Sequence, residues 1–139
     1  MSAKISINWK EDMSFNTHVN GHSIVIDADE KVGGKDRGPR PKPLLLVALG
    51  GCTAMDVVSI LKKMRVEFDK FDIDVEAEST SEHPVYYKKI KINYHFTGHQ
   101  LPEDKIEKAV KLSQERYCGV SEMLKKAAAL EHEIFIHEA

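Results

Sequence analysis

The 139-residue sequence contains no long hydrophobic run, no block of basic residues and only two cysteines. Its longest unbroken apolar stretch, residues 44–49, is far shorter than the roughly 20 residues that span a bilayer. The net charge of −2 and the lack of interleaved basic and aromatic residues argue against a nucleic-acid-binding protein. The polar, alternating start MSAKISINWKED does not resemble a signal peptide. We therefore expect a soluble cytoplasmic protein that binds neither membranes nor nucleic acids.

The two cysteines, Cys52 and Cys118, lie 66 positions apart, outside any CxxC motif or Cys/His cluster with metal-ligand spacing. A cytosolic disulfide, where one occurs, tends to be transient and catalytic. Free cysteines are also among the most deeply buried residues, so composition alone favours two unrelated buried thiols. The seven histidines are scattered, and an isolated His-x-x-x-His does not supply a tetrahedral zinc site. We expect no metal site.

The first 27 residues alternate between apolar and polar positions, which predicts three strands. Residues 4–10 form the first strand, residues 13–19 the second and residues 22–27 the third. Asn20-Gly21 between the last two is a strong hairpin signal. This part of the chain is therefore predicted to be an antiparallel meander.

A Gly- and Pro-rich loop over residues 28–42 then leads into a long helix over residues 43–66. Loops of this length in compact domains tend to be functional. Residues 44–49 are apolar at every position, as in a helix buried on all sides. Gly50 and Gly51 directly precede Cys52, and each costs a helix interior about 1 kcal/mol relative to alanine. The glycine pair thus indicates close approach of another backbone, a partner helix or a ligand.

The second half predicts an antiparallel strand pair over residues 71–79 and 83–98, followed by a helix that opens at residues 101–104. A short helix follows over residues 120–129, and a closing strand over residues 130–138. The order βββ–loop–α–ββ–α–α–β indicates one α+β domain with antiparallel sheet and helices on one side. The sheet of one chain is too small to cover a central helix that is apolar on all sides. We therefore infer a dimer in which this helix packs between the subunits.

Two segments, PxPLLLVALGGCTAMDVVSIL and LSxERYC, resemble the OsmC-like family of osmotically induced and organic hydroperoxide resistance proteins. The branch that the chain resembles most carries GGCTAxDVV and LSxEKYC. The resemblance covers essentially all of residues 1–139 and implies an intertwined homodimer, with antiparallel sheets wrapped around two long central helices. It also implies a cofactor-free thiol peroxidase in which Cys52 is peroxidatic and Cys118 resolving.

Two features of the family pattern are missing here. The family usually has a glutamate nine or ten residues before the first cysteine, where this chain has Lys42 and Pro43. The hydroperoxide resistance branch also has a catalytic arginine on its N-terminal segment, whereas residues 1–30 contain no arginine. A replacement must come from Lys42, Arg37, Arg40 or the partner chain, and Arg40 is the first candidate because its loop can fold over the helix.

Peroxide reduction needs a thiolate, a cation that lowers its pKa and a second thiol to capture the sulfenic acid. The chain is expected to reduce organic hydroperoxides through Cys52 and Cys118, with an external dithiol as reductant and no metal, haem or flavin. The alternative is a binding or redox-sensing dimer of the same fold with little or no turnover. Asp56 is interpreted as structural and Tyr117 as a core residue. Arg116 is either a solvated helix residue or an activator.

Overall fold

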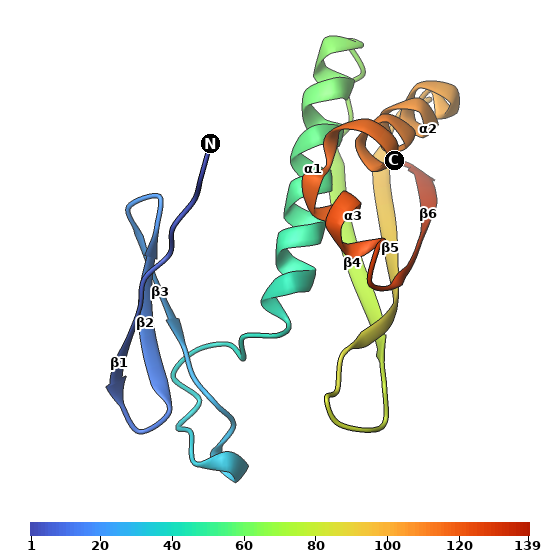
Figure 1. The fold of residues 1–139 in the computed structure, drawn as a ribbon. Coiled ribbons are helices and arrows are strands. Elements are labelled where there is room, and N and C mark those ends of the chain that lie inside the picture. The colour runs from blue at the N-terminus through green and yellow to red at the C-terminus, as the bar shows by residue number, and fades with distance from the viewer. The chain divides into compact units, whose positions relative to one another are not determined.

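The computed structural model describes all 139 residues as two compact units, residues 1–45 and 46–139 (Figure 1). The strands and helices follow one another in the predicted order, with a short 3-10 helix and a π-helical turn in addition. The α+β class predicted from the sequence is confirmed.

The N-terminal unit contains an antiparallel sheet of β1 (Ile7–Glu11), β2 (Ser14–Val19) and β3 (His22–Ile26). Asn20 and Gly21 form the turn between β2 and β3 with positive φ angles of 52° and 82°. This left-handed backbone is typical of a two-residue hairpin loop, so the predicted turn is confirmed.

The loop that follows β3 is organised around the buried carboxylate of Asp27. This carboxylate accepts hydrogen bonds from the backbone N–H groups of Ala28, Lys35 and Arg37, at 2.7, 3.2 and 3.1 Å. A 3-10 helix, Glu30–Val32, occupies the middle of the loop. A stretch without sequence periodicity is therefore ordered by one side chain that satisfies three backbone donors.

The apolar side chains of the first strand are not covered within the N-terminal unit. Every residue of β1 is exposed, and Ile5, Ile7 and Trp9 are 52%, 56% and 64% exposed. The sequence predicts a half-buried strand here, and the N-terminal unit by itself does not bury it. Exposed apolar side chains gathered in this way are typical of an interaction surface.

The C-terminal unit packs helices against one face of a three-stranded sheet (Figure 1). The predicted antiparallel pairing of β4 with β5 is confirmed, whereas β6 runs parallel to β5, which makes the sheet mixed. The elements are α1 (Leu44–Lys63), β4 (Lys70–Ser79), β5 (Tyr87–Gly98), α2 (Glu103–Leu112), the π-helical turn Ser113–Tyr117, α3 (Gly119–Leu124) and β6 (Ala129–Glu138).

The core of this unit lies between the sheet and the helices. Alternate residues of β5 point into it and are almost completely buried, as the period-two pattern predicts. The buried apolar residues are Leu49, Val57, Leu61, Val66, Ile90, Ile92, Tyr94, Phe96, Ile106, Ala109 and Val110.

The central helix is less buried than its sequence suggests. Its length and composition would allow it to cross a membrane, as is also true of many core helices. One face packs on the sheet, but Leu45 and Val47 are 46% and 66% exposed. The prediction that residues 44–49 are buried on all sides is therefore wrong for the single chain.

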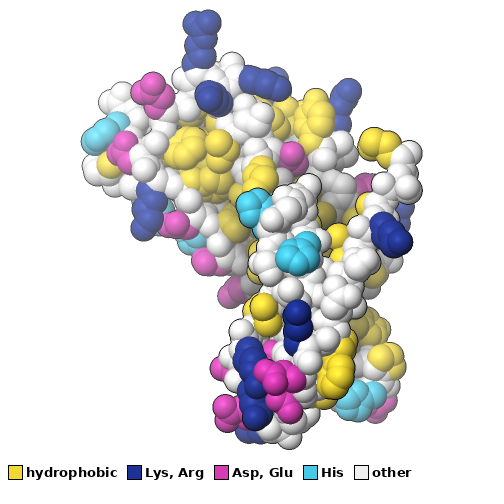
Figure 2. Space-filling model, turned by 90° about the vertical axis from the view of Figure 1, so that its left-hand side faces the viewer, with side chains coloured by type: hydrophobic (Ala, Val, Ile, Leu, Met, Phe, Trp, Pro, Cys, Tyr) yellow, Lys and Arg dark blue, Asp and Glu magenta, His cyan; other side chains and the backbone are white.

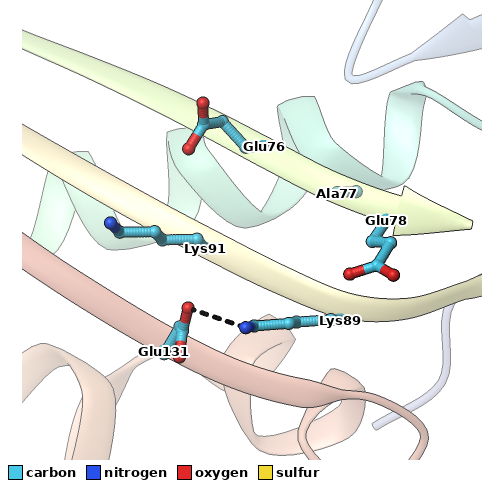
Figure 3. A pocket seen from close by; sticks show the side chains of 6 residues that line it. All are labelled: Glu76, Ala77, Glu78, Lys89, Lys91 and Glu131. Carbon is cyan, nitrogen blue, oxygen red and sulfur yellow. Dashed lines mark ion pairs between the residues drawn. The ribbon is translucent and has the colours of Figure 1, made fainter.

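The opposite face of the sheet carries charged side chains (Figure 3). A hollow of about 260 Å³ there is lined by Glu76, Ala77, Glu78, Lys89, Lys91 and Glu131. Lys89 pairs with Glu131 at 3.5 Å, and Lys91 pairs with Glu133 at 2.9 Å. Solvent-exposed cross-strand pairs of this kind help to fix strand register and contribute little to stability.

Candidate functional site

The two cysteines meet in the C-terminal unit, although 66 residues separate them. Cys52 lies on α1, and Cys118 lies directly before α3. Their sulfur atoms and a carboxylate oxygen of Asp56 all lie within 4.8 Å of one another. The structure thus brings together both cysteines singled out in the sequence and adds a carboxylate.

The π-helical turn that ends α2 places Cys118 opposite α1. The N–H of Cys118 donates to the carbonyl oxygen of Ser113, five residues earlier, at 2.8 Å. Cys118 then adopts an extended backbone, with φ −78° and ψ 101°, and its sulfur caps α3 by accepting the N–H of Ser121 at 3.4 Å. π-helical turns are rare and frequently occur at functional sites.

Both sulfur atoms accept a backbone N–H group from the start of α3. Ser121 donates to Cys118, and Val120 donates to Cys52. Such hydrogen bonds stabilise negative charge on sulfur. The same short segment therefore orients both thiols.

A buried network of hydrogen bonds lies next to the two thiols. The hydroxyl of Thr53 lies 2.7 Å from the Tyr94 hydroxyl and 2.8 Å from the Ser113 hydroxyl. Ser113 also donates to Asp56 Oδ2 at 3.0 Å, and Gln114 Nε2 donates to the Tyr94 hydroxyl at 2.7 Å. These bonds connect α1, β5 and the π-helical turn, which fixes the carboxylate of Asp56 beside the sulfurs.

The local environment of Cys52 keeps its thiol protonated. Burial raises the pKa of Cys52, and the hydrogen bond to the Cys118 thiol and the charge of Asp56 raise it further; the N–H of Val120 opposes these effects. No cation is among the groups that act on this pKa. Burial likewise raises the pKa of Tyr94 to about 12, so its hydroxyl stays neutral.

The arginine predicted to activate the thiol belongs to the N-terminal unit. Arg40 pairs with Asp36 at 2.6 Å and donates to the carbonyl oxygen of Gly38 at 2.8 Å. Arg37 pairs with Asp12 at 3.3 Å and with Glu11 at 3.5 Å. All of these contacts lie within that unit, and the role of Arg40 at Cys52 stays a prediction.

Sequence reasoning missed the polar network and misplaced one aromatic residue. The spacing of Thr53 and Asp56, which follow Cys52 on α1, was the only signal in the sequence for polar partners of the thiol. Tyr117 is 55% exposed rather than in the core, and the guanidinium of Arg116 lies over its ring at 5.7 Å. The role of Arg116 at the thiols stays a prediction.

An apolar hollow of about 360 Å³ opens beside the turn of α1 that precedes Cys52. It is lined by Leu46, Val47, Gly50, Gly51, Ile73 and Val75. A Cβ on Gly50 would lie 3.0 Å from Val75 Cγ2, whereas a Cβ on Gly51 would meet nothing within 4 Å. Gly50 therefore permits close packing of α1 on β4, and Gly51 leaves open surface.

Comparison with known proteins identifies the family. The model of the family described as OsmC-like protein matches residues 33–133. Protein YhfA of Escherichia coli (strain K12) is 35% identical over 127 residues, which are 91% of this chain and 92% of the relative.

Solved structures share the fold. A hypothetical protein from Aquifex aeolicus VF5 superposes with a TM-score of 0.87 at 30% identity, covering 100% of this chain and 99% of that one. The organic hydroperoxide resistance protein OhrB of Bacillus subtilis shares the fold at 14% identity, with a TM-score of 0.66 over 96% of this chain and 98% of that one. The chain therefore belongs to the OsmC-like protein family.

Proposed function

We propose that the protein is a cytoplasmic thiol peroxidase that reduces organic hydroperoxides through Cys52 and Cys118. The observation that carries this proposal is the closeness of the two thiols, whose sulfur atoms lie within 4.8 Å of each other although 66 residues separate them. Sulfur atoms this close can reach the roughly 2.05 Å of a disulfide bond by rotation of the two side chains and a small backbone adjustment. Two cysteines that served only as core residues would have no reason to meet in this way.

The chemistry balances with the two thiols alone. The thiolate of Cys52 attacks the terminal peroxide oxygen, the O–O bond breaks, and the alkoxide leaves as an alcohol after it takes up a proton. The resulting sulfenic acid on Cys52 reacts with the thiol of Cys118, which forms the disulfide and releases water. An external dithiol then reduces the disulfide by exchange.

The surroundings of the thiols favour an organic peroxide. The hollow lined by Leu46, Ile73 and Val75 offers an apolar surface beside the α1 turn that precedes Cys52. Burial of a hydrocarbon group there contributes about 25 cal/mol of binding free energy for each Å² of apolar surface, whereas hydrogen peroxide has no apolar surface to bury. Because the C-terminal unit holds no cation at Cys52, we propose that Arg40 or a residue of a partner chain supplies the positive charge.

We further propose that residues 1–139 work as a single OsmC-like domain in an intertwined homodimer with α1 at its centre. Val47, Met55 and Val58 are 66%, 76% and 41% exposed, and with Gly51 they share one face of α1. Exposed hydrophobic side chains also form patches on the surface in Figure 2. An apolar stripe with a glycine at its centre suits close packing of a second helix.

Replacing Gly51 by alanine tests the proposed dimer. On an exposed helix this change stabilises the fold by about 1 kcal/mol. Against a closely packed partner helix, the added methyl group should weaken the dimer about tenfold or more in Kd, as overpacking typically costs 1–3 kcal/mol. Sedimentation equilibrium measures the Kd of the dimer, and Lys63→Ala, on another face of α1, serves as the control. A monomeric wild-type protein, or an unchanged Kd in Gly51→Ala, would contradict the proposal.

Mass spectrometry tests the proposed reaction directly. Reduced protein is treated with one equivalent of cumene hydroperoxide in the presence of a metal chelator. We expect the intact mass to fall by two hydrogen atoms and the peptide map to show a Cys52–Cys118 disulfide. The Cys118→Ser variant should instead gain one oxygen atom, on Cys52. If both thiols of the wild-type protein stay reduced while the peroxide persists, the peroxidase proposal is wrong.

One observation favours a second function, a redox sensor or ligand-binding dimer of the same fold. The pKa of Cys52 is raised, and its charged neighbour is the carboxylate of Asp56 rather than a cation. A thiol in this state reacts slowly. Formation of the disulfide after one equivalent of peroxide, but without turnover in excess dithiol, would identify the sensor.

A further inference from the structure

We propose that Cys52, Asp56 and Cys118 in the reduced protein form a binding site for a thiophilic divalent metal ion of the Zn²⁺ type. Two sulfurs and a carboxylate oxygen, one from each residue, all lie within 4.8 Å of one another. Sulfur and carboxylate oxygen are both ordinary zinc ligands in proteins. The proposal needs only the reduced thiols and holds whether or not the protein turns over peroxide.

The dimensions of the cluster suit a tetrahedral ion. Zinc–sulfur bonds of about 2.3 Å and zinc–oxygen bonds of about 2.1 Å at tetrahedral angles place the ligand atoms roughly 3.6–3.8 Å apart. Since the three ligand atoms already lie within 4.8 Å, the side chains need to close by about 1 Å at most. Rotation of the two cysteine side chains supplies this, because each sulfur is one bond from Cβ.

The backbone brings the three ligands together from two directions. Cys52 and Asp56 are four residues apart on α1, which places them on one face of the helix. Cys118 approaches from the end of the π-helical turn. Metal binding would therefore join two elements that are already in contact and would not have to order a loose segment.

Hydrogen bonds around the ligands have the arrangement that supports a metal site. Ser113 donates to Asp56 Oδ2 at 3.0 Å, which orients the carboxylate and engages one of its two oxygens. The N–H groups of Val120 and Ser121 donate to the two sulfurs. Partners of this kind orient the coordinating side chains in metalloproteins, and their removal typically lowers metal affinity 10- to 100-fold.

The ligand types select the class of ion. Two thiolates disfavour Mg²⁺ and Ca²⁺, which take oxygen ligands, and the carboxylate disfavours Cu⁺, which takes soft ligands only. Three protein ligands leave the fourth tetrahedral position for water. With both sulfurs bound to the ion, Cys52 and Cys118 would be protected from oxidation to the disulfide.

The test is a zinc titration of the reduced protein without peroxide, in competition with a chromophoric chelator and with a phosphine reductant. We expect one tight equivalent per chain. Loading with Co²⁺ should give the sulfur-to-cobalt charge-transfer band and the ligand-field bands of a tetrahedral site with thiolate ligands. This measurement is independent of the disulfide test above, which is run with a chelator.

Four variants distinguish zinc binding at the proposed site from adventitious zinc binding by histidines. Cys52→Ser and Cys118→Ser should lose the tight equivalent and the charge-transfer band. Asp56→Asn should keep the band and weaken zinc binding at least about tenfold. Asp104→Asn, which removes an exposed carboxylate on α2, should bind as the wild type does. The proposal is overturned if the reduced wild-type protein binds no zinc, or if Cys118→Ser binds it equally well.

Discussion

Replacing Cys52 by serine should reduce the turnover of organic hydroperoxides to the uncatalysed rate. We expect a loss on the order of 10³-fold or more, because a serine hydroxyl in this site is not ionised and is a far weaker nucleophile than a thiolate. A coupled assay with a dithiol reductant and cumene hydroperoxide measures it. Serine preserves the size of the side chain, so the fold should be retained.

The dependence of the rate on pH gives this prediction a second readout. Because the pKa of Cys52 is raised, the thiol is mostly protonated at neutral pH. At pH values below that pKa, the thiolate fraction increases about tenfold for each unit by which the pH rises. Turnover limited by the attack of Cys52 should rise with the same slope. A flat profile near neutral pH would instead mean that a cation holds the pKa low in the assembled protein. Equal rates for Cys52→Ser and the wild type would refute the assignment of Cys52.

Replacing Phe96 by alanine should destabilise the fold by about 3–5 kcal/mol, a large part of the stability of a typical domain. The ring of Phe96 is completely buried and stacks on Phe71, with centroids 4.4 Å apart and an interplanar angle of 4°. Phe68 meets it edge-on at 6.0 Å. Removing the ring leaves a cavity whose aromatic walls cannot easily collapse. Urea denaturation followed by circular dichroism measures the loss.

Phe135 provides a matched control on the other side of the sheet. It is only half-buried and stacks on His95 with centroids 4.8 Å apart. Phe135→Ala should cost about 1–2 kcal/mol, because the ring buries less area and leaves no enclosed cavity. If the two variants lost equal stability, the placement of the core between the sheet and the helices would be wrong.

Features of the fold that depend on local pattern follow from the sequence. The alternation of apolar and polar residues predicts the strands, and Asn20-Gly21 predicts the hairpin turn that the structure has. The apolar run and its amphipathic continuation predict α1. These features are encoded over a few neighbouring residues, through side-chain direction and backbone preference, so they do not require knowledge of distant contacts.

The candidate site depends on contacts between distant residues, which only the tertiary structure decides. Family resemblance singles out Cys52 and Cys118, but their meeting depends on a π-helical turn that carries no sequence signal of its own. The place of Asp56 beside the sulfurs depends on a hydrogen bond from Ser113, which lies 57 residues away in the sequence.

The sequence by itself thus determined the elements, the family and the two thiols. The tertiary structure decided that the thiols meet, that a carboxylate lies beside them, and that the last strand runs parallel to its neighbour. The physical reason is that element type is set by interactions between near neighbours. The meeting of side chains from α1, β5 and the end of α2 is set by how whole elements pack.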